Sequence, residues 1–259
     1  MTSEFRQTTR ALLMTVEAHT SYPVHVIPEP KLQTAASMSI ARGDKAMHVI
    51  RYKPVVGEEP DYLICTQCGF ILRKFSVPTE QRVDFSSSRQ GQYTTMALLR
   101  DGVAKKFKLD ATQLSGLRDQ ILDGLLIHLL SIPVGLRVSS WLETDHPELN
   151  DLQRSSVLRD LRQNRETMDP RIKQTFPPKI FNATQAISAA YAMHWAGKLG
   201  EPQLAAPWLS DFRQEGLALL AILNEVSSDA ASDQDLVDRW AEKLKLKGWY
   251  SWVPYQAPR

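Results

Sequence analysis

The stretch Pro60-Asp-Tyr-Leu-Ile-Cys-Thr-Gln-Cys-Gly-Phe-Ile-Leu-Arg-Lys-Phe75 decides how we interpret the fold of this chain. Its apolar residues leave little room for a solvated face, which predicts a helix that lies largely inside the protein. Asp61 follows a proline and is suited to cap the free amide groups of the first turn. The stretch also holds both cysteines, Cys65 and Cys68. We therefore expect it to be the central helix and the place of any active site.

The residues before this helix predict a small α+β region. An apolar stripe of helical period over residues 3–19 predicts a first helix. β-branched runs at 24–27 and 47–52 predict two strands, and the small residues at 34–41 are a third candidate. Residues 42–45 have the composition of a hairpin turn. The first 75 residues therefore read as a helix, two or three strands, and the central helix.

The residues after this helix predict a loop and then helices to the end of the chain. Residues 76–92 are rich in Ser, Gln and Arg, which is typical of a mobile loop or linker. The helical pattern that follows is divided by prolines, glycines and capping residues into predicted helices at 110–130, 133–142, 147–168, 182–197, 202–226 and 233–246. The fold class is therefore α+β, with a small N-terminal helix, strands and helix followed by a mostly α-helical C-terminal region. We place the two domains at residues 1–92 and 93–259.

Composition predicts an ordinary soluble protein. Of the 259 residues, 43% are hydrophobic, and the formal net charge is +2. The longest apolar run, 125–134, is far shorter than the ~20 residues that span a bilayer. We expect no secretory signal, no membrane span, reduced thiols and a cytoplasmic location. The oligomeric state stays open.

Basic residues gather in the window 71–110. Eight basic residues stand there against four acidic ones: Arg73, Lys74, Arg82, Arg89, Arg100, Lys105, Lys106 and Lys108 against Glu80, Asp84, Asp101 and Asp110. A solvated surface is the first interpretation, and an anionic partner such as a nucleic acid is the alternative. We expect no aromatic stacking platforms among these charges.

The end of the chain, residues 248–255, holds four aromatic residues: Trp249, Tyr250, Trp252 and Tyr255. Such a tail is rarely left in solvent. We expect it to fold back onto the helical half as a packing strap, and a partner-binding segment is the alternative.

The two cysteines allow three interpretations. Free cysteines are usually buried, so structural thiols come first. Two thiolates three residues apart also make half of a tetrahedral zinc site, which His25, His48 or His128 would have to complete. Gly69, directly after Cys68, would suit a zinc-knuckle turn. A redox pair is the third interpretation.

The order of helix, strands and buried helix resembles the minimal zincin domain of the ImmA/IrrE-like metallopeptidases. In that family the buried helix carries His-Glu-x-x-His, with two zinc ligands and a Glu that activates the zinc-bound water. Laid on this chain, the motif falls on residues 66–70. Thr66 stands at the first His, Gln67 at the Glu and Phe70 at the second His.

These three residues remove the chemistry that the resemblance implies. Gln67 accepts no proton near neutral pH, and neither Thr66 nor Phe70 offers an imidazole. We therefore expect no catalytic residues and no cofactor, and a bacterial, non-catalytic scaffold that binds a protein partner or a nucleic acid. Its candidate partner surface is Arg73, Lys74, Arg82, Arg89, Trp249, Tyr250 and Trp252. The alternative function is a zinc-stabilised module or metalloenzyme that uses Cys65, Cys68 and His128.

Overall fold

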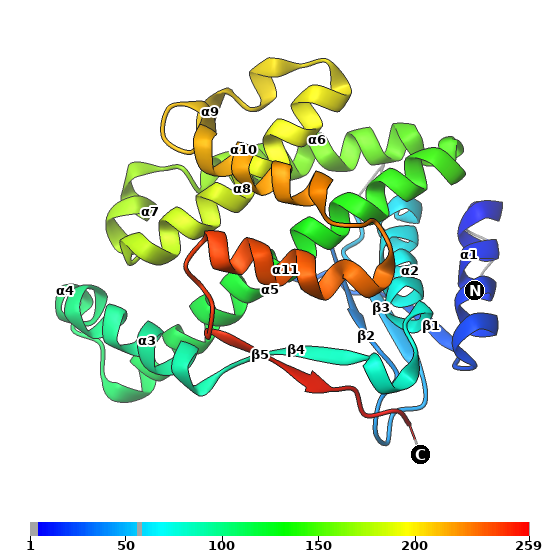
Figure 1. The fold of residues 1–259 in the computed structure, drawn as a ribbon, viewed down its shortest axis with the longest axis horizontal. Helices are drawn as coiled ribbons and strands as arrows, with labels where there is room; N and C mark the ends of the chain where they lie inside the picture. Colours follow the sequence, from blue (N-terminus) through cyan, green and yellow to red (C-terminus); the bar gives the residue numbers. More distant parts are fainter. Residues whose placement is uncertain (1–4, 56–58, 259) are drawn as a thin grey trace. The chain divides into compact units, whose positions relative to one another are not determined.

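The computed structural model describes residues 5–55 and 59–258 and confirms an α+β fold with a mostly helical C-terminal region (Figure 1). The described residues divide into two compact units. The first comprises Met1–Asp84, Gly135–Leu158 and Pro254–Arg259, and the second comprises Phe85–Val134 and Arg159–Val253. Both units are built from segments that are distant in the sequence, and the domain boundary at residue 92 stays a prediction.

The first unit contains the predicted helix, strands and helix. Its elements are α1 Gln7–Thr20, β1 Val24–Pro28, β2 Ala36–Ser39, β3 His48–Tyr52, α2 Asp61–Ser76 and the 3-10 turn η1 Thr79–Gln81. It also takes residues 135–145 of α5 Ala111–Asp145, the 3-10 turn η3 Pro147–Leu149 and the first half of α6 Asn150–Glu166. All three strands and both helices are therefore confirmed, while residues 3, 4 and 56–58 of the expected helix and loop lie outside the described residues.

The three strands form one mixed sheet in the order β1-β3-β2. β1 runs parallel to β3, with Val24 opposite His48, and β2 runs antiparallel to β3, with Met38 opposite Ile50. Burial alternates along β3, where His48 and Ile50 are fully buried and Val49 is partly exposed. This period of two shows that one face of the sheet carries the core.

The central helix α2 packs against α1, β2 and β3 (Figure 1). Its buried face includes Ile64, Cys65, Cys68 and Ile71, each with no exposed surface. Burying side chains of this size stabilises the unit by roughly 2 kcal/mol for each isoleucine. The prediction of a largely buried helix is confirmed.

Residues 135–158 contribute further buried side chains to this core, among them Val138, Leu142 and Leu149. A Cβ atom placed on Gly69 would lie 2.4 Å from Cγ1 of Val138, so α2 and the end of α5 approach each other closely there. A buried polar bridge lies nearby: the Tyr62 hydroxyl is 3.0 Å from the Ser139 hydroxyl, and the Gln153 amide donates to the Ser139 carbonyl at 2.9 Å. Gly69 therefore belongs to the interior of the predicted helix, and the alternative of a zinc-knuckle turn after Cys68 is not observed.

The start of α2 differs from the prediction. Asp61 is the first helical residue and does not cap its own helix; Pro60 holds the N-cap position. Asp61 is 2% exposed, and its carboxylate accepts hydrogen bonds from the Arg6 amide, just before α1, and from the Thr9 hydroxyl on α1. The capping prediction failed because donors 52 and 55 residues away occupy the carboxylate.

The second unit is helical apart from one two-stranded sheet. Its elements are β4 Val83–Ser87, α3 Arg89–Leu99, the π-helical turn η2 Arg100–Ala104, α4 Lys105–Phe107, α5 to residue 134, α6 from residue 159, α7 Pro170–Thr175, α8 Pro178–Leu199, η4 Pro202–Leu204, α9 Ala206–Leu209, α10 Arg213–Glu225, η5 Ala230–Ser232, α11 Asp233–Lys243 and β5 Tyr250–Pro254. β4 and β5 pair with each other, and their first or last residues belong to the first unit. The aromatic tail thus folds back as a strand, as the packing interpretation predicts.

Several local predictions in this half needed correction. The expected loop or linker at 76–92 contains η1, β4 and the start of α3. The Ser88 hydroxyl caps α3 by accepting from the Gly91 amide at 2.9 Å. α5 runs through Pro133 without ending there. α8 begins at Pro178, four residues before the helix start predicted at residue 182. The capped start at Asp110 is confirmed by reciprocal hydrogen bonds between Asp110 and Gln113.

The region 202–226 also differs, because η4, α9 and α10 stand where one helix was expected.

Among the described helices, α5 is long and apolar enough to cross a membrane by length and composition. Half of its most apolar window is buried within the protein, and buried Leu122, Leu126 and Leu129 alternate with exposed Asp123, Gly124 and Ile127. A core helix passes the same test. The expectation of no membrane span stays a prediction.

Candidate functional site

The zincin motif positions lie on α2, in the middle of the first unit. The Thr66 hydroxyl donates back to the Tyr62 carbonyl at 2.8 Å, a bond that a helical threonine makes with its own helix. Phe70 is half-buried and packs against the core, and Gln67 is half-buried. These three side chains supply neither an imidazole nor a carboxylate, so they offer none of the groups that a zincin motif needs.

Both thiols lie on the buried face of α2. Burial raises the pKa of Cys65 to about 12, although the Thr9 hydroxyl at 3.4 Å opposes the shift, and burial raises the pKa of Cys68 further still. Both groups are therefore protonated near neutral pH, whereas metal binding and nucleophilic attack require the thiolate. This environment fits structural thiols.

The histidines proposed as zinc ligands differ in their surroundings. His25 is exposed on β1, His48 is buried in other contacts, and His128 belongs to the second unit. Within the described ranges, His, Cys, Asp and Glu side chains form no group of three or more that could hold a metal. Cys65 and Cys68 therefore supply two sulfur atoms, and no described His, Asp or Glu side chain joins them in such a group. The zinc-stabilised module stays a prediction.

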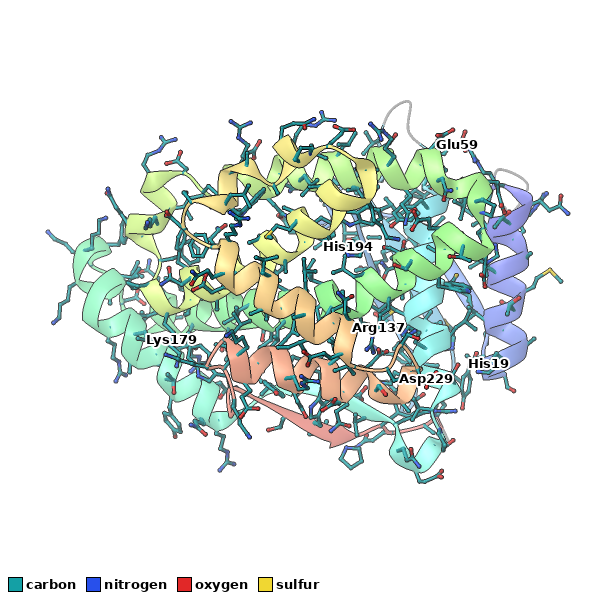
Figure 2. The ribbon with its side chains drawn as sticks, turned by 45° about the horizontal axis from the view of Figure 1, so that its top comes forward. His19, Glu59, Arg137, Lys179, His194 and Asp229 are labelled. Atoms are coloured by element: carbon teal, nitrogen blue, oxygen red, sulfur yellow. The ribbon has the colours of Figure 1, made fainter. Side chains whose placement is uncertain are left out.

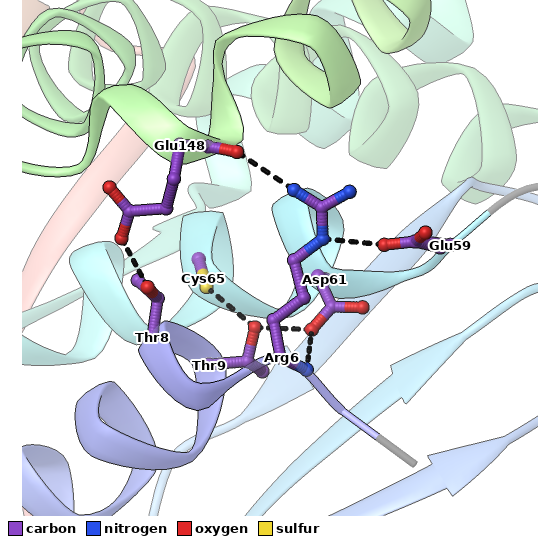
Figure 3. A network of polar contacts seen from close by, with 7 residues as sticks. All are labelled: Arg6, Thr8, Thr9, Glu59, Asp61, Cys65 and Glu148. Carbon is purple, nitrogen blue, oxygen red and sulfur yellow. Dashed lines mark hydrogen bonds and ion pairs between the residues drawn. The ribbon is translucent and has the colours of Figure 1, made fainter.

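A polar network surrounds the start of α2 (Figure 3). Asp61 accepts from the Arg6 amide at 2.8 Å and from the Thr9 hydroxyl at 2.5 Å. The Arg6 guanidinium donates to the Glu59 carboxylate at 2.5 Å and to the Glu148 carbonyl at 2.8 Å. We call these five residues, with Thr8 and Cys65, the Asp61 network.

The Asp61 network ties three segments together. Thr8 on α1 donates to the Glu148 carboxylate on η3, and this bond lowers the pKa of Glu148. The Arg6 hydrogen bond likewise lowers the pKa of Glu59. Because its donors and acceptors are bonded to each other, the network positions α1, α2 and η3. The sequence signal that could have revealed it is a lone carboxylate at the start of an otherwise apolar helix.

His48 forms a second buried polar centre, on β3. Its Nδ1 accepts the Ala41 amide hydrogen at 3.2 Å, so the ring proton lies on Nε2, which donates to the Thr20 hydroxyl at 3.0 Å. Thr20 in turn donates to the Val16 carbonyl at 2.8 Å. Burial lowers the pKa of His48 to about 4. Each polar atom of the ring is therefore used in holding β3 to α1 and to the strand connection.

Two cations of the predicted partner surface are occupied at the end of α2. Lys74 donates to the Val83 carbonyl at 3.0 Å and forms an ion pair with Asp84. Arg82 donates to the carbonyls of Phe75 and Val77 at 2.9 and 2.8 Å, where the helix ends. Cations near a helix C-terminus satisfy its unpaired carbonyl groups. Arg73 is half-buried, and Arg89 is exposed on α3.

The aromatic tail residues in the predicted surface are engaged in packing. Trp249 is 2% exposed, and the Lys179 ammonium lies 4.8 Å from its ring centre (Lys179 is labelled in Figure 2). The Tyr250 hydroxyl and the Trp252 indole N–H both donate to Asp238 of α11 at 2.7 Å. Burial, followed by Asp238, raises the pKa of Tyr250. These contacts hold β5 against α11.

Other aromatic side chains of the basic window are open to solvent. Tyr93 on α3 is 77% exposed and Phe107 on α4 is 48% exposed. The expectation that no aromatic platforms stand among these charges is therefore wrong. The sequence contains both rings, and their exposure follows from the helices that carry them.

No model of a known protein family, no curated protein and no solved structure matches this chain. The zincin resemblance therefore depends on the element order and on the register of residues 66–70.

Proposed function

We propose that this protein is a non-catalytic interaction scaffold, built on a degenerate zincin-like region and working in a bacterial-type cytoplasm through protein or nucleic-acid partners. The observation that carries the proposal is the content of α2. Where the ImmA/IrrE-like family has its histidines and glutamate, this helix has Thr66, Phe70 and Gln67. The order α1, β1, β2, β3, α2 supports the register.

The packing of α2 supports a structural use of the helix. Thr66 is bonded to its own backbone, and Phe70 packs against the core. The Cys65 thiol, with a pKa of about 12, stays protonated. A helix that is tightly packed and has no charged group at the motif positions is suited to hold surfaces in place, and hydrolysis needs an activated water that these side chains cannot supply.

The test is an assay of purified protein for bound zinc and for cleavage of an unfolded substrate such as casein. We expect neither stoichiometric zinc nor hydrolysis. One tightly held zinc per chain, together with hydrolysis that a chelator abolishes and zinc restores, would refute the proposal.

A substitution at Gln67 sharpens this test. Gln67→Glu restores the general base of the family motif, and Gln67→Ala is its matched control. We expect both variants to stay inactive, because Thr66 and Phe70 still offer no zinc ligand. Hydrolysis that appears in Gln67→Glu alone would reveal a working site on α2 and would contradict the proposal.

A further inference from the structure

One face of α3, continued by Arg100 at the first position of η2, carries exposed charge and an exposed ring. Arg89, Tyr93 and Arg100 are exposed, and at about 100° per residue they lie within about 40° of one another around the helix. The opposite face holds Gly91, Thr95 and Leu99, which are buried. The two arginines are separated by about 16 Å along the axis, with the ring of Tyr93 between them.

The chain continues this surface through η2 and α4. Exposed Lys105, Lys106 and Lys108 flank the exposed Phe107 in the sequence, and the Lys106 ammonium lies 5.5 Å from the centre of that ring. We call Arg89, Tyr93, Arg100, Lys105, Lys106, Phe107 and Lys108 the α3–α4 surface. From residue 89 to residue 108 the sequence has five basic residues and one acidic residue.

Two features of the backbone mark this segment. η2 is a π-helical turn, a form that is rare and that frequently lies at functional sites. Lys108, at the end of α4, has a φ of 52°, a left-handed conformation that glycine or asparagine adopts at less cost. A lysine therefore stands where the backbone conformation favours glycine or asparagine.

The chemistry of the surface selects its partner. Arginine and lysine side chains bind phosphate groups, and exposed aromatic rings stack on bases that are not already stacked in a duplex. A helix that lies in a membrane interface has a continuous apolar face. On α3 and η2 the apolar side chains Leu99 and Val103 are buried, Met96 and Leu98 are half-buried, and the exposed apolar residues among those described are Tyr93 and the small Ala97, so no continuous apolar face is exposed there.

From this combination we propose that the α3–α4 surface binds single-stranded nucleic acid, with the cations on the phosphates and Tyr93 and Phe107 as stacking platforms. The proposal deepens the proposed function, on which it rests, by naming one class of partner. It differs from the predicted partner surface, because Lys74 and Arg82 are occupied within the first unit. The experiments remain separable, since the zinc and casein assays do not involve nucleic acid.

The test is a titration of the full chain into a fluorescein-labelled oligothymidylate of about 20 nucleotides, which is longer than the ~4–16 nucleotides that one binding module covers. Fluorescence anisotropy is measured at several salt concentrations. We expect binding that weakens as salt rises. A lack of binding at low salt, or tighter binding to phosphatidylserine vesicles than to the oligonucleotide, would overturn the proposal.

Charge variants measure the phosphate contacts. Replacing Lys105, Lys106 and Lys108 by alanine should reduce the slope of log affinity against log salt by about 2, since each phosphate contact with a single strand contributes about 0.7. The matched control replaces three exposed lysines of the first unit, Lys31, Lys45 and Lys53, by alanine. It removes the same amount of positive charge. Equal slopes for the two triple variants would show a non-local charge effect and contradict the proposal.

Ring variants measure the stacking. Tyr93→Ala and Phe107→Ala should each weaken binding about 5- to 100-fold at constant salt. Tyr93→Phe keeps the ring and should bind as the unchanged protein does. Both residues are exposed, so their loss leaves the core intact. If neither alanine variant weakens binding, the rings are not stacking platforms and the proposal fails.

Discussion

Replacing Gly69 by alanine should destabilise the first unit by about 1 kcal/mol. The added Cβ would lie 2.4 Å from Cγ1 of Val138 and 3.2 Å from Cζ3 of Trp141. Ordinary carbon contacts are about 3.5–4.0 Å, so the first contact is more than 1 Å too short. Valine in a helix has one preferred rotamer and cannot turn away cheaply. Overpacking costs roughly 1–3 kcal/mol, against which alanine regains up to about 1 kcal/mol of helix propensity.

A double-mutant cycle tests the contact itself. Val138→Ala alone removes buried methyl groups and should cost about 2 kcal/mol. In the Gly69→Ala/Val138→Ala variant the new methyl group occupies part of the space that valine left. The double variant should therefore be about 1–2 kcal/mol more stable than the sum of the single changes predicts.

Gly124 provides the matched control. It is a helical, exposed glycine of α5 with no atom within 4 Å of an added Cβ. Gly124→Ala should stabilise the protein by about 0.5–1 kcal/mol. Urea unfolding measures each variant, and a chain of this size shifts its melting temperature by roughly 2–4 °C per kcal/mol. If Gly69→Ala is as stable as Gly124→Ala, or if the cycle is additive, the close approach of α2 to α5 is refuted.

Three further predictions concern buried polar groups. The pKa of His48 falls from its ordinary 6.5 to about 4, so the unfolded chain takes up a proton at this residue before the folded chain does. The free energy of unfolding should therefore be highest above pH ~6.5 and fall by up to ~3 kcal/mol toward pH 4. His48→Gln should reduce this pH dependence in urea titrations. The double variant Cys65→Ala/Cys68→Ala should have the same zinc content as the unchanged protein, and a loss of bound zinc would support the metal interpretation. In the unchanged protein both thiols should react with Ellman's reagent only when the chain unfolds. Serine is a poorer replacement because it buries new hydroxyl groups. Thr9→Val removes a donor to the buried Asp61 carboxylate and should lower the free energy of unfolding by about 2 kcal/mol. Thr8→Val removes an exposed bond to Glu148 and should lower it by under about 0.5 kcal/mol. Equal losses in the two variants would show that burial does not strengthen the Thr9 bond.

The hydrophobic period and the composition of the sequence were sufficient to predict the order of helices and strands from α1 to α2 in the first unit. The buried helix α2, the alternating strands β1 and β3 and the amphipathic α1 each have a pattern that is local in the sequence. The non-catalytic interpretation of α2 also came from side-chain chemistry alone, since Gln67 cannot act as a base. Local patterns such as these do not depend on which segment lies opposite.

Capping and helix boundaries were less predictable. Asp110 caps α5 as predicted, while Asp61 has the same local signature and binds Arg6 and Thr9 instead. Pro133 has the signature of a helix start and lies within α5. A proline in a helix removes one backbone hydrogen bond, and surrounding burial can offset that loss. The deciding contacts are not in the local sequence.

By itself, the amino-acid sequence determined that α2 is a buried helix, that its motif positions carry Thr66, Gln67 and Phe70, and that no proton acceptor stands among them. Only the tertiary structure decided which charged groups remain available to a partner. Lys74 and Asp61 are used in internal bonds, whereas the charges around Tyr93 face solvent. The physical reason is that the partners of Lys74 and Asp61 are 10 to 55 residues away in the sequence, so the fold has to bring those segments together before the charges are occupied.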